Sequence, residues 1–286
     1  MRAEAIVSGD ARAQAFLDLL ARDAREAIPA EGIAVVVAHP DDETIGIGGQ
    51  LPRLSGVTLL HVTDGAPRSD GAAQAHGFPT PEAYAAARRE ELRAALALAA
   101  VPEQALVSLG IPDQEASLHL FDIAHRLAVL FRERKIVVVV THAFEGGHPD
   151  HDATALAVHA AAALLRAEQG DGPEIIEMPL YHLGLSGWTV QRFVAAAGPP
   201  ELEIQLTEDQ RRLKRVMLDA HVTQRQVLSM VAADVERFRP APAYDFSVLP
   251  NEGRLLYDLH GWGMTGPRWQ SLSATALQDL GLGAVL

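Results

Sequence analysis

Short apolar runs alternate with amphipathic segments along the first two-thirds of the chain. Helical spacing of apolar residues occurs over 44–54, 81–100, 118–134 and 152–167. Between these segments lie the runs that predict buried strands, at Ile33–Ala38, Val57–Thr63, Ala105–Leu109, Ile136–Thr141 and Ile175–Leu180. Strands that alternate with helices predict an α/β fold, with a mostly parallel sheet and helices on both faces.

The two ends of the chain depart from this pattern. Residues 1–30 are predicted to supply a covering helix, because apolar residues within 11–27 have helical spacing. Near the other end, a strand-like segment at Glu201–Leu206 precedes a long helical pattern over 207–237, and a loop-rich tail follows. We find no internal repeat or low-complexity linker. We therefore expect residues 31–286 to form a single α/β domain, in which 199–286 is a C-terminal elaboration.

Composition narrows the classes of protein that fit. The 286 residues are 48% hydrophobic, without an apolar run near the ~20 residues of a membrane helix or an apolar N-terminal region typical of a secretory signal. We therefore expect a cytoplasmic protein. Lys and Arg total 24 against 37 Asp and Glu, a net charge of −13 that disfavours nucleic acid and anionic membranes as partners. Because the sequence has no cysteine, any metal must be held by histidines and carboxylates.

Two clusters of histidine and aspartate follow predicted strands. His39, Asp41 and Asp42 come directly after the first strand, and His-Pro-Asp-His at 148–151 follows the run 136–141. Ligands bind beyond the carboxyl ends of strands in such sheets, and buried acids need a partner or a metal. We interpret the clusters as two halves of one metal site, with His39 and Asp42 from one loop and His151 from the other. The alternative is that His39 and Asp42 only cap the following helix.

In these motifs the chain resembles the PIG-L/LmbE-like zinc deacetylases, which remove acetyl groups from N-acetylglucosamine-type sugars. The family signatures Ala-His-Pro-Asp-Asp-Glu and His-Pro-Asp-His stand intact at 38–43 and 148–151, and weaker similarity covers most of 31–230. The resemblance implies a Rossmann-like fold and a zinc ion (Zn²⁺) held by His39, Asp42 and His151. It also implies a small-molecule N-acetylated sugar as substrate, whose amide is attacked by zinc-bound water.

Three more residues of the motifs are candidates for catalysis. Asp41 stands beside the ligands without being one and matches the family's general base, which takes the proton of the attacking water. His148 is predicted to stabilise the tetrahedral oxyanion, and Asp150 to orient His148. The plainer interpretation of Asp41 and Asp150 is helix N-capping.

Two residues outside the motifs are candidates for substrate binding. The resemblance suggests that Arg88 reaches the substrate, although an exposed ion pair with Glu91 at i,i+3 would also explain it. Asp113 is predicted to bind sugar hydroxyls, the alternative being a turn aspartate. One position departs from the family: some members carry a tyrosine where this chain has Gly146. The sequence leaves open which residue replaces that tyrosine.

Other functions fit parts of the pattern. The substrate could be a different N-acyl compound, such as an antibiotic or thiol conjugate. Two histidines and one carboxylate also form the iron site of non-haem oxygenases, while His151-Asp152 suggests phosphoester hydrolysis without the phosphate-binding loop that this would need. A non-enzymatic metal or sugar module would leave Asp41 without a role. The sequence leaves the oligomeric state open, a homo-oligomer included.

Overall fold

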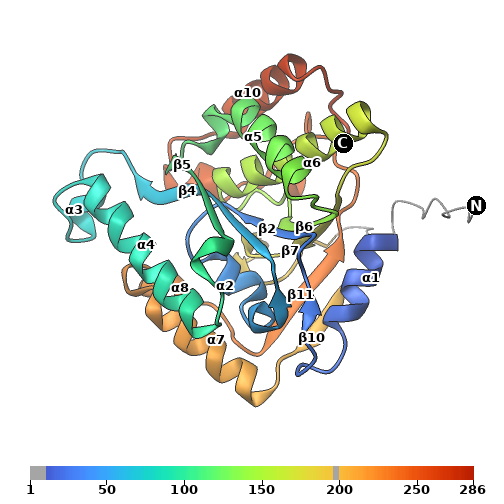
Figure 1. Ribbon diagram of the computed structural model, residues 1–286. Helices are drawn as coiled ribbons and strands as arrows, with labels where there is room; N and C mark the ends of the chain where they lie inside the picture. The colour runs from blue at the N-terminus through green and yellow to red at the C-terminus, as the bar shows by residue number, and fades with distance from the viewer. Residues whose placement is uncertain (1–10, 196–199) are drawn as a thin grey trace, which may run out of the picture.

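A mixed seven-stranded sheet runs through the centre of the computed structural model, which describes residues 11–195 and 200–286 (Figure 1). Its strand order is β10-β11-β7-β6-β2-β4-β5. The strands from β7 to β5 are parallel, whereas β11 is antiparallel to both of its neighbours. Their bounds are β2 Ile33–Val37, β4 Thr58–Pro67, β5 Leu106–Asp113, β6 Val138–His142, β7 Glu174–Met178, β10 Leu202–Gln205 and β11 Val235–Pro240.

Helices cover both faces of the sheet, because alternate residues of the buried strands point to opposite sides. In β2, Ala34 and Val36 join a hydrophobic cluster with α5 (Leu120–Glu133), α6 (Pro149–Gln169) and α10 (Gly266–Asp279). Val35 and Val37 join a second cluster on the opposite face. That cluster includes α1 (Ala11–Leu20), α2 (Asp42–Ile47), α4 (Pro81–Leu98) and α7 (Glu208–Ala220). The predicted fold class, a Rossmann-like α/β sandwich, is confirmed.

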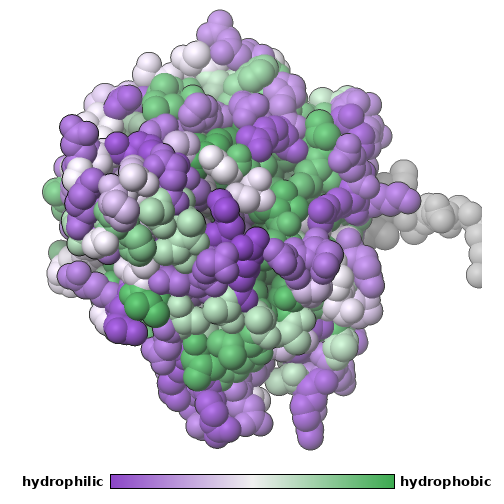
Figure 2. Space-filling model, turned by 60° about the vertical axis from the view of Figure 1, so that its left-hand side comes forward, coloured by the Kyte–Doolittle hydropathy of each residue, from purple (hydrophilic) through white to green (hydrophobic). Residues whose placement is uncertain are grey.

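Smaller elements complete the described chain. They include β1 (Ile28–Pro29) paired with β3 (Leu54–Ser55), the hairpin of β8 (Tyr181–Gly184) and β9 (Gly187–Val190), and the short helices α3 (Ala72–Ala75), α8 (Arg225–Leu228) and α9 (Tyr257–His260). On the face shown in Figure 2, hydrophilic residues surround separate apolar patches. Among the described residues, no helix has both the length and the apolar character needed to cross a bilayer.

The prediction of one long helix over 207–237 was wrong. Helix α7 ends at Ala220, and β11 begins at Val235. The strand escapes recognition because its charged residues are buried in ion pairs: Glu236 with Lys214 at 2.7 Å, and Arg239 with Glu177 at 2.9 Å. A strand that buries paired charges shows no apolar run.

The tail was also predicted to be rich in loops, and this is wrong for its last part. Helix α10 begins after the N-cap Thr265, whose side chain accepts the backbone N–H of Arg268, with a proline in its first turn. It buries Trp269 completely in the cluster shared with α5 and α6. The N-terminal helix lies at 11–20, inside the predicted 11–27, whereas residues 1–10 of the predicted covering segment lie outside the described residues.

The sheet positions both sequence motifs at one edge. Strand β2 pairs in parallel with β6 on one side and with β4 on the other, and β4 pairs in parallel with β5. The carboxyl ends of neighbouring parallel strands meet at the same edge, so the loops after β2 and β6 face each other there. Asp113 is the last residue of β5 and reaches the same edge.

Candidate active site

Three side chains from the two motifs converge on one point. His39 follows β2, Asp42 opens α2, and His151 lies in the first turn of α6. Asp42 lies between the two rings, with its Oδ2 3.2 Å from His39 Nδ1 and its Oδ1 3.4 Å from His151 Nε2. The backbone N–H of His39 also donates to Asp42 Oδ2, at 2.7 Å. All three residues are buried, and each offers a ligand atom within 4.8 Å of the others.

The donor atoms of this group suit a divalent cation. His151 Nε2 is buried and has no hydrogen-bond partner in the described part of the chain, although it faces a carboxylate. A buried polar atom without a partner is costly, and a bound ion would remove that cost. Two imidazole nitrogens and one carboxylate oxygen form a donor set that zinc accepts at catalytic sites. The residues present therefore fit the ion that the sequence motifs predict.

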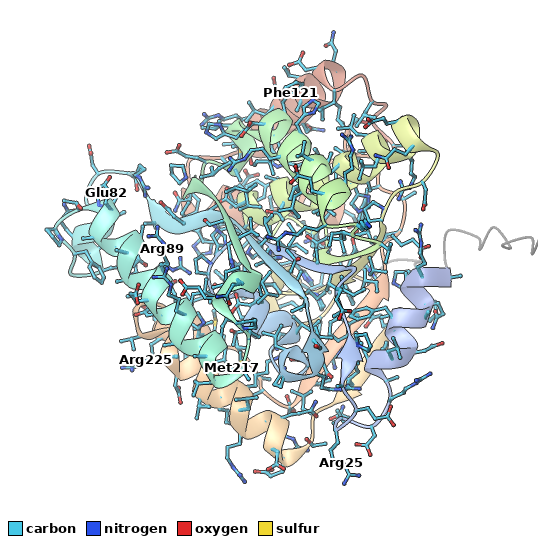
Figure 3. All side chains as sticks on the ribbon, in the orientation of Figure 1. Arg25, Glu82, Arg89, Phe121, Met217 and Arg225 are labelled. Carbon is cyan, nitrogen blue, oxygen red and sulfur yellow. The ribbon has the colours of Figure 1, made fainter. Side chains whose placement is uncertain are left out.

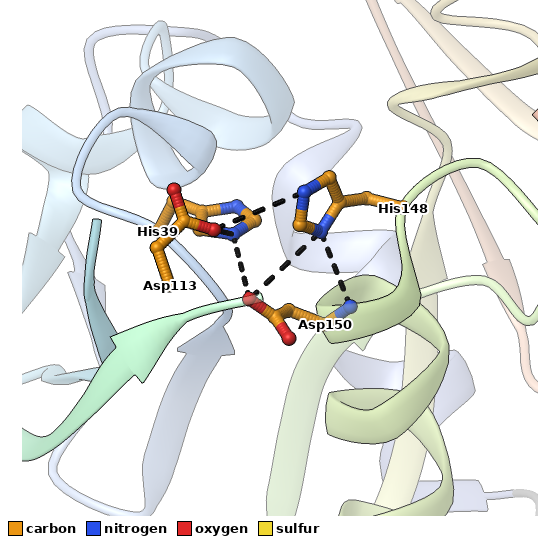
Figure 4. A group of neighbouring side chains, drawn as sticks. All are labelled: His39, Asp113, His148 and Asp150. Carbon is orange, nitrogen blue, oxygen red and sulfur yellow. Dashed lines mark hydrogen bonds and ion pairs between the residues drawn. The ribbon is translucent and has the colours of Figure 1, made fainter. Parts of the chain in front are cut away.

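The second nitrogen of His39 is held by two carboxylates (Figure 4). Its Nε2 lies 3.1 Å from Asp113 Oδ1 and 3.2 Å from Asp150 Oδ2. Asp150 is fixed in turn by the backbone N–H groups of Gln114 and Ala116, at 2.6 and 3.0 Å. A carboxylate on the far nitrogen of a ligating histidine fixes its tautomer and its ring orientation. In this geometry His39 is free to bind an ion through Nδ1.

Asp150 thus contacts His39 more closely than His148, which it was predicted to orient. Its carboxylate Oδ2 lies 3.9 Å from His148 Nδ1. The contact with His148 comes from the backbone instead, since the N–H of Asp150 donates to Nδ1 at 3.2 Å. The cap of α6 is therefore the side chain of His148, so the N-capping interpretation of Asp150 does not hold.

Asp41 lies beside the group in an unusual backbone conformation. Its backbone φ is 138°, a value that residues other than glycine rarely adopt and that commonly marks functional sites. It occupies the N-cap position of α2, yet its side chain makes no capping hydrogen bond, so capping does not explain it. Burial raises the pKa of Asp41 to about 8, although Arg88 opposes the shift. The Nη2 atom of Arg88 lies 3.0 Å from Asp41 Oδ2.

Arg88 is buried and does not form the exposed ion pair with Glu91. Its guanidinium donates to the carbonyls of Gly65 and Pro40, at 2.6 and 2.8 Å, as well as to Asp41. Glu91 instead accepts hydrogen bonds from the backbone and the hydroxyl of Thr223. Arg88 therefore fixes the loop that carries Asp41, and it lines the same pocket as His39 and Asp42.

His148 lines the same pocket as Asp41. Its ring packs edge-on against His39, with 4.6 Å between centroids, and its Nε2 lies 3.8 Å from Asp113 Oδ1. Because Nδ1 accepts the N–H of Asp150, the ring proton of the neutral form belongs on Nε2. Burial holds the pKa of His148 well below its usual range, and the charge of His39 lowers it further. His148 therefore presents to the pocket a neutral ring that can donate a hydrogen bond from Nε2.

The pocket has a volume of about 200 Å³. Its lining includes the predicted residues His39, Asp41, Asp42, Arg88, Asp113 and His148. Tyr84 lines it too, as do three aromatic residues from later in the chain that the sequence motifs did not identify, Tyr181, Trp188 and Trp262. They come from the hairpin β8–β9 and from the loop between α9 and α10. Only Trp262 carried a local signal, its position between two glycines.

Gly146 has a structural reason to lack a side chain. Its φ is +71°, and an added Cβ would lie 2.6 Å from Leu255 Cδ2. A tyrosine therefore does not fit there. The nearest tyrosine to the proposed ligands is Tyr181, whose ring centroid lies 5.0 Å from that of His151.

Comparison with known protein families gives a match to one family model over part of the chain. Residues 34–162, which include both motifs, match the PIG-L family model, described as GlcNAc-PI de-N-acetylase. A search of curated proteins gave no significant match.

Solved structures with the same fold include several deacetylases. The zinc-inhibited form of a teicoplanin deacetylase has a TM-score of 0.53 at 17% identity, over 73% of this chain and 97% of that one. The deacetylase of the A40926 pseudoaglycone scores 0.55 at 20% identity, over 73% and 96% of the two chains. The N,N'-diacetylchitobiose deacetylase of Pyrococcus horikoshii scores 0.53 at 19% identity, over 82% and 93%. At these identities the likeness establishes the fold.

Proposed function

We propose that this chain, which belongs to the PIG-L family, is a metal-dependent hydrolase that removes the acetyl group from an N-acetylglucosamine-type sugar conjugate. The observation that carries the proposal is the convergence of His39, Asp42 and His151, in which the buried Nε2 of His151 has no hydrogen-bond partner among the described residues. Deacetylase activity of proteins with this fold supports the reaction class.

The metal would be held by His39 through Nδ1, by Asp42 and by His151 through Nε2. Zinc suits this donor set, because its catalytic sites combine three protein ligands with an open position. When bound, the ion supplies Lewis acidity, which polarises the amide carbonyl and lowers the pKa of water. Asp150 and Asp113 keep the His39 ring turned toward the ion.

Asp41 acts as general base in this proposal. It must be ionised to accept the proton of the attacking water, and the adjacent Arg88 guanidinium favours the ionised form. A divalent cation at the neighbouring ligands would favour it further. The water oxygen bonds to the acetyl carbon, the C–N bond breaks, and Asp41 returns the proton to the departing amine. The products are acetate and the free amino sugar.

His148 stabilises the transition state in this proposal. As a neutral ring with its proton on Nε2, it donates a hydrogen bond to the oxyanion that develops on the carbonyl oxygen. Arg88 has a positioning role, because its hydrogen bonds hold Asp41 and the loop before it. Asp113 reaches the pocket and accepts from His39, so it both orients that ring and offers an acceptor to substrate hydroxyls.

An acetate-release assay tests the proposal. The protein would be stripped with a chelator, reloaded with zinc, and assayed on a panel of N-acetylated amino sugars and their conjugates. We expect acetate and a primary amine in equal amounts, only from the reloaded protein. A requirement for oxygen and 2-oxoglutarate, or release of phosphate instead of acetate, would contradict the proposed class.

A further inference from the structure

Five aromatic rings form a closed circle of contacts on one side of the pocket. His148 and His151 lie 5.4 Å apart between centroids, and His151 lies 5.0 Å from Tyr181. Tyr181 is 4.9 Å from Trp188, and Trp188 is 6.3 Å from Trp262. Trp262 closes the circle at 4.7 Å from His148. The two tryptophans are thus connected to both histidines of the second motif.

The circle joins two parts of the chain. His148 and His151 lie within the segment that matches the family, 34–162, whereas the other three rings lie beyond it. Trp188 and Trp262 are only partly buried, unlike Trp269, which the hydrophobic core encloses completely. Partly exposed indoles in a concave site are suited to contact a ligand that has an apolar face and a polar edge. His260 supports them from outside, stacked on Trp262 at 5.0 Å.

Polar side chains also line the pocket. Asp113, Arg88 and Gln114 line it, as does Gln224, whose amide donates to Tyr84 Oη at 2.6 Å. A volume of about 200 Å³ lies below the roughly 300–1,000 Å³ typical of sites for drug-sized ligands. The space therefore suits one sugar ring, with C–H groups toward the indoles and hydroxyls toward the polar side.

We propose that Trp188 and Trp262 determine specificity, by stacking on the apolar face of a single hexosamine ring and so presenting its N-acetyl group to the reacting centre. This inference rests on the proposed deacetylase function. It adds that selection for the sugar comes from segments outside the family-matched region. Trp262 also contacts His148, whereas Trp188 touches neither histidine of the circle. Substitution of Trp188 is therefore the more specific test, because it removes no contact with either histidine.

The first experiment compares a cyclic with an acyclic substrate. Steady-state kinetics of Trp188→Ala and Trp262→Ala would be measured on a methyl glycoside of N-acetylglucosamine and on N-acetylethanolamine. Loss of one aromatic contact should raise KM for the glycoside about fivefold to tenfold. The preference for the glycoside over the acyclic amide should fall by the same factor, and Trp262→Phe should recover part of it.

Phe121→Ala serves as the matched control, because Phe121 is an exposed aromatic residue on α5, at the outer surface (Figure 3). It should leave the preference unchanged. An unchanged preference in both tryptophan variants, with thermal stability like that of the parent protein, would overturn the inference.

A binding measurement separates this inference from the proposed function. Metal-free protein would be titrated with the glycoside while tryptophan emission is recorded. We expect an emission change in the parent protein and none in the Trp188→Ala/Trp262→Ala double variant, since Trp269 is buried away from solvent. Emission change without acetate release by zinc-loaded protein would preserve the stacking site and reject the proposed function. Acetate release without any emission change would preserve the function and reject the stacking site.

Discussion

The parallel part of the sheet and the segments that follow it contribute differently to the pocket. The segments after β2 and β6 supply His39, Asp42 and His151, and each residue is placed by a strand end or a helix start. The later segments supply Trp188 and Trp262 from a hairpin and a loop. The comparison suggests that the chemistry is built into the regular fold, where spacing is fixed, whereas substrate selection lies on elements that can vary without disturbing it.

The largest effect is expected from His151→Ala, which removes a proposed ligand from the parallel part. The parent protein should contain about one zinc ion per chain, and the variant almost none. Turnover should fall by at least about 10³-fold, because the metal supplies several kcal/mol of transition-state stabilisation. Elemental analysis and acetate release would measure both. The control is His125→Ala, since His125 is an exposed histidine on α5; equal metal content in all three proteins would rule out the ligand assignment.

Lys214→Met tests how α7, in the C-terminal part of the chain, holds α2 in place. Lys214 Nζ donates to the carbonyl of Ile45 in α2 at 2.8 Å and to Glu236 at 2.7 Å, and both charged side chains are buried. The variant leaves Glu236 buried without its charge partner, so the free energy of unfolding should fall by about 3–5 kcal/mol. Chemical denaturation would be compared with that of Arg215→Met, an exposed position on the same helix. A loss below about 1 kcal/mol would show that the ion pair does not hold α2 in place.

Asp150→Asn tests whether the Asp150 carboxylate orients the ring of His39. The amide cannot charge-balance His39 as the carboxylate does, so zinc affinity should weaken about 10- to 100-fold. Competition with a zinc-binding dye would measure it. Asp152→Asn is the matched variant, because the Asp152 carboxylate accepts the N–H of Gly146. If the two variants bind zinc equally well, Asp150 does not position His39.

The smallest effect is a pH dependence from Glu145, a buried residue that precedes the second motif. Burial raises the pKa of Glu145 to about 8 from its usual 4.5. The folded state then holds a proton that the unfolded state releases. The associated stability is complete below about pH 4.5 and disappears as pH rises through 8. We expect a loss of about 2 kcal/mol between pH 6 and pH 8.

Glu145→Gln should remove most of that slope, because an amide does not titrate. The amide oxygen can still accept the backbone N–H of Val194, so this hydrogen bond is kept. Thermal unfolding at both pH values would measure the difference between the two proteins. Parallel pH profiles would mean that another buried group is responsible.

Sequence alone predicted the parts of this molecule that are marked by a pattern of apolar residues or by a motif. The apolar runs located the five parallel strands, and the two motifs named the three residues that converge. Strand β11 was missed because its buried charges are paired across the fold, which no local pattern records. The same limit applied to Asp150, since its contact with His39 spans residues far apart in the sequence.

The aromatic residues outside the two motifs were the least predictable part of the pocket. Tyr181 and Trp188 lie on a short hairpin, and Trp262 lies in a loop, so neither helical nor strand periodicity relates them. Only the folded chain shows that Tyr181 lies against His151 and that Trp262 lies against His148.

The most direct test of the proposed mechanism is Asp41→Asn, assayed for both metal and turnover. The substitution keeps the size of the side chain and an oxygen for Arg88 but removes the proton acceptor. Zinc should remain at about one ion per chain while kcat falls by roughly 10²–10⁴-fold; in Asp42→Asn, zinc should be lost as well. Near-native turnover of Asp41→Asn on the true substrate would contradict the role of Asp41 as general base.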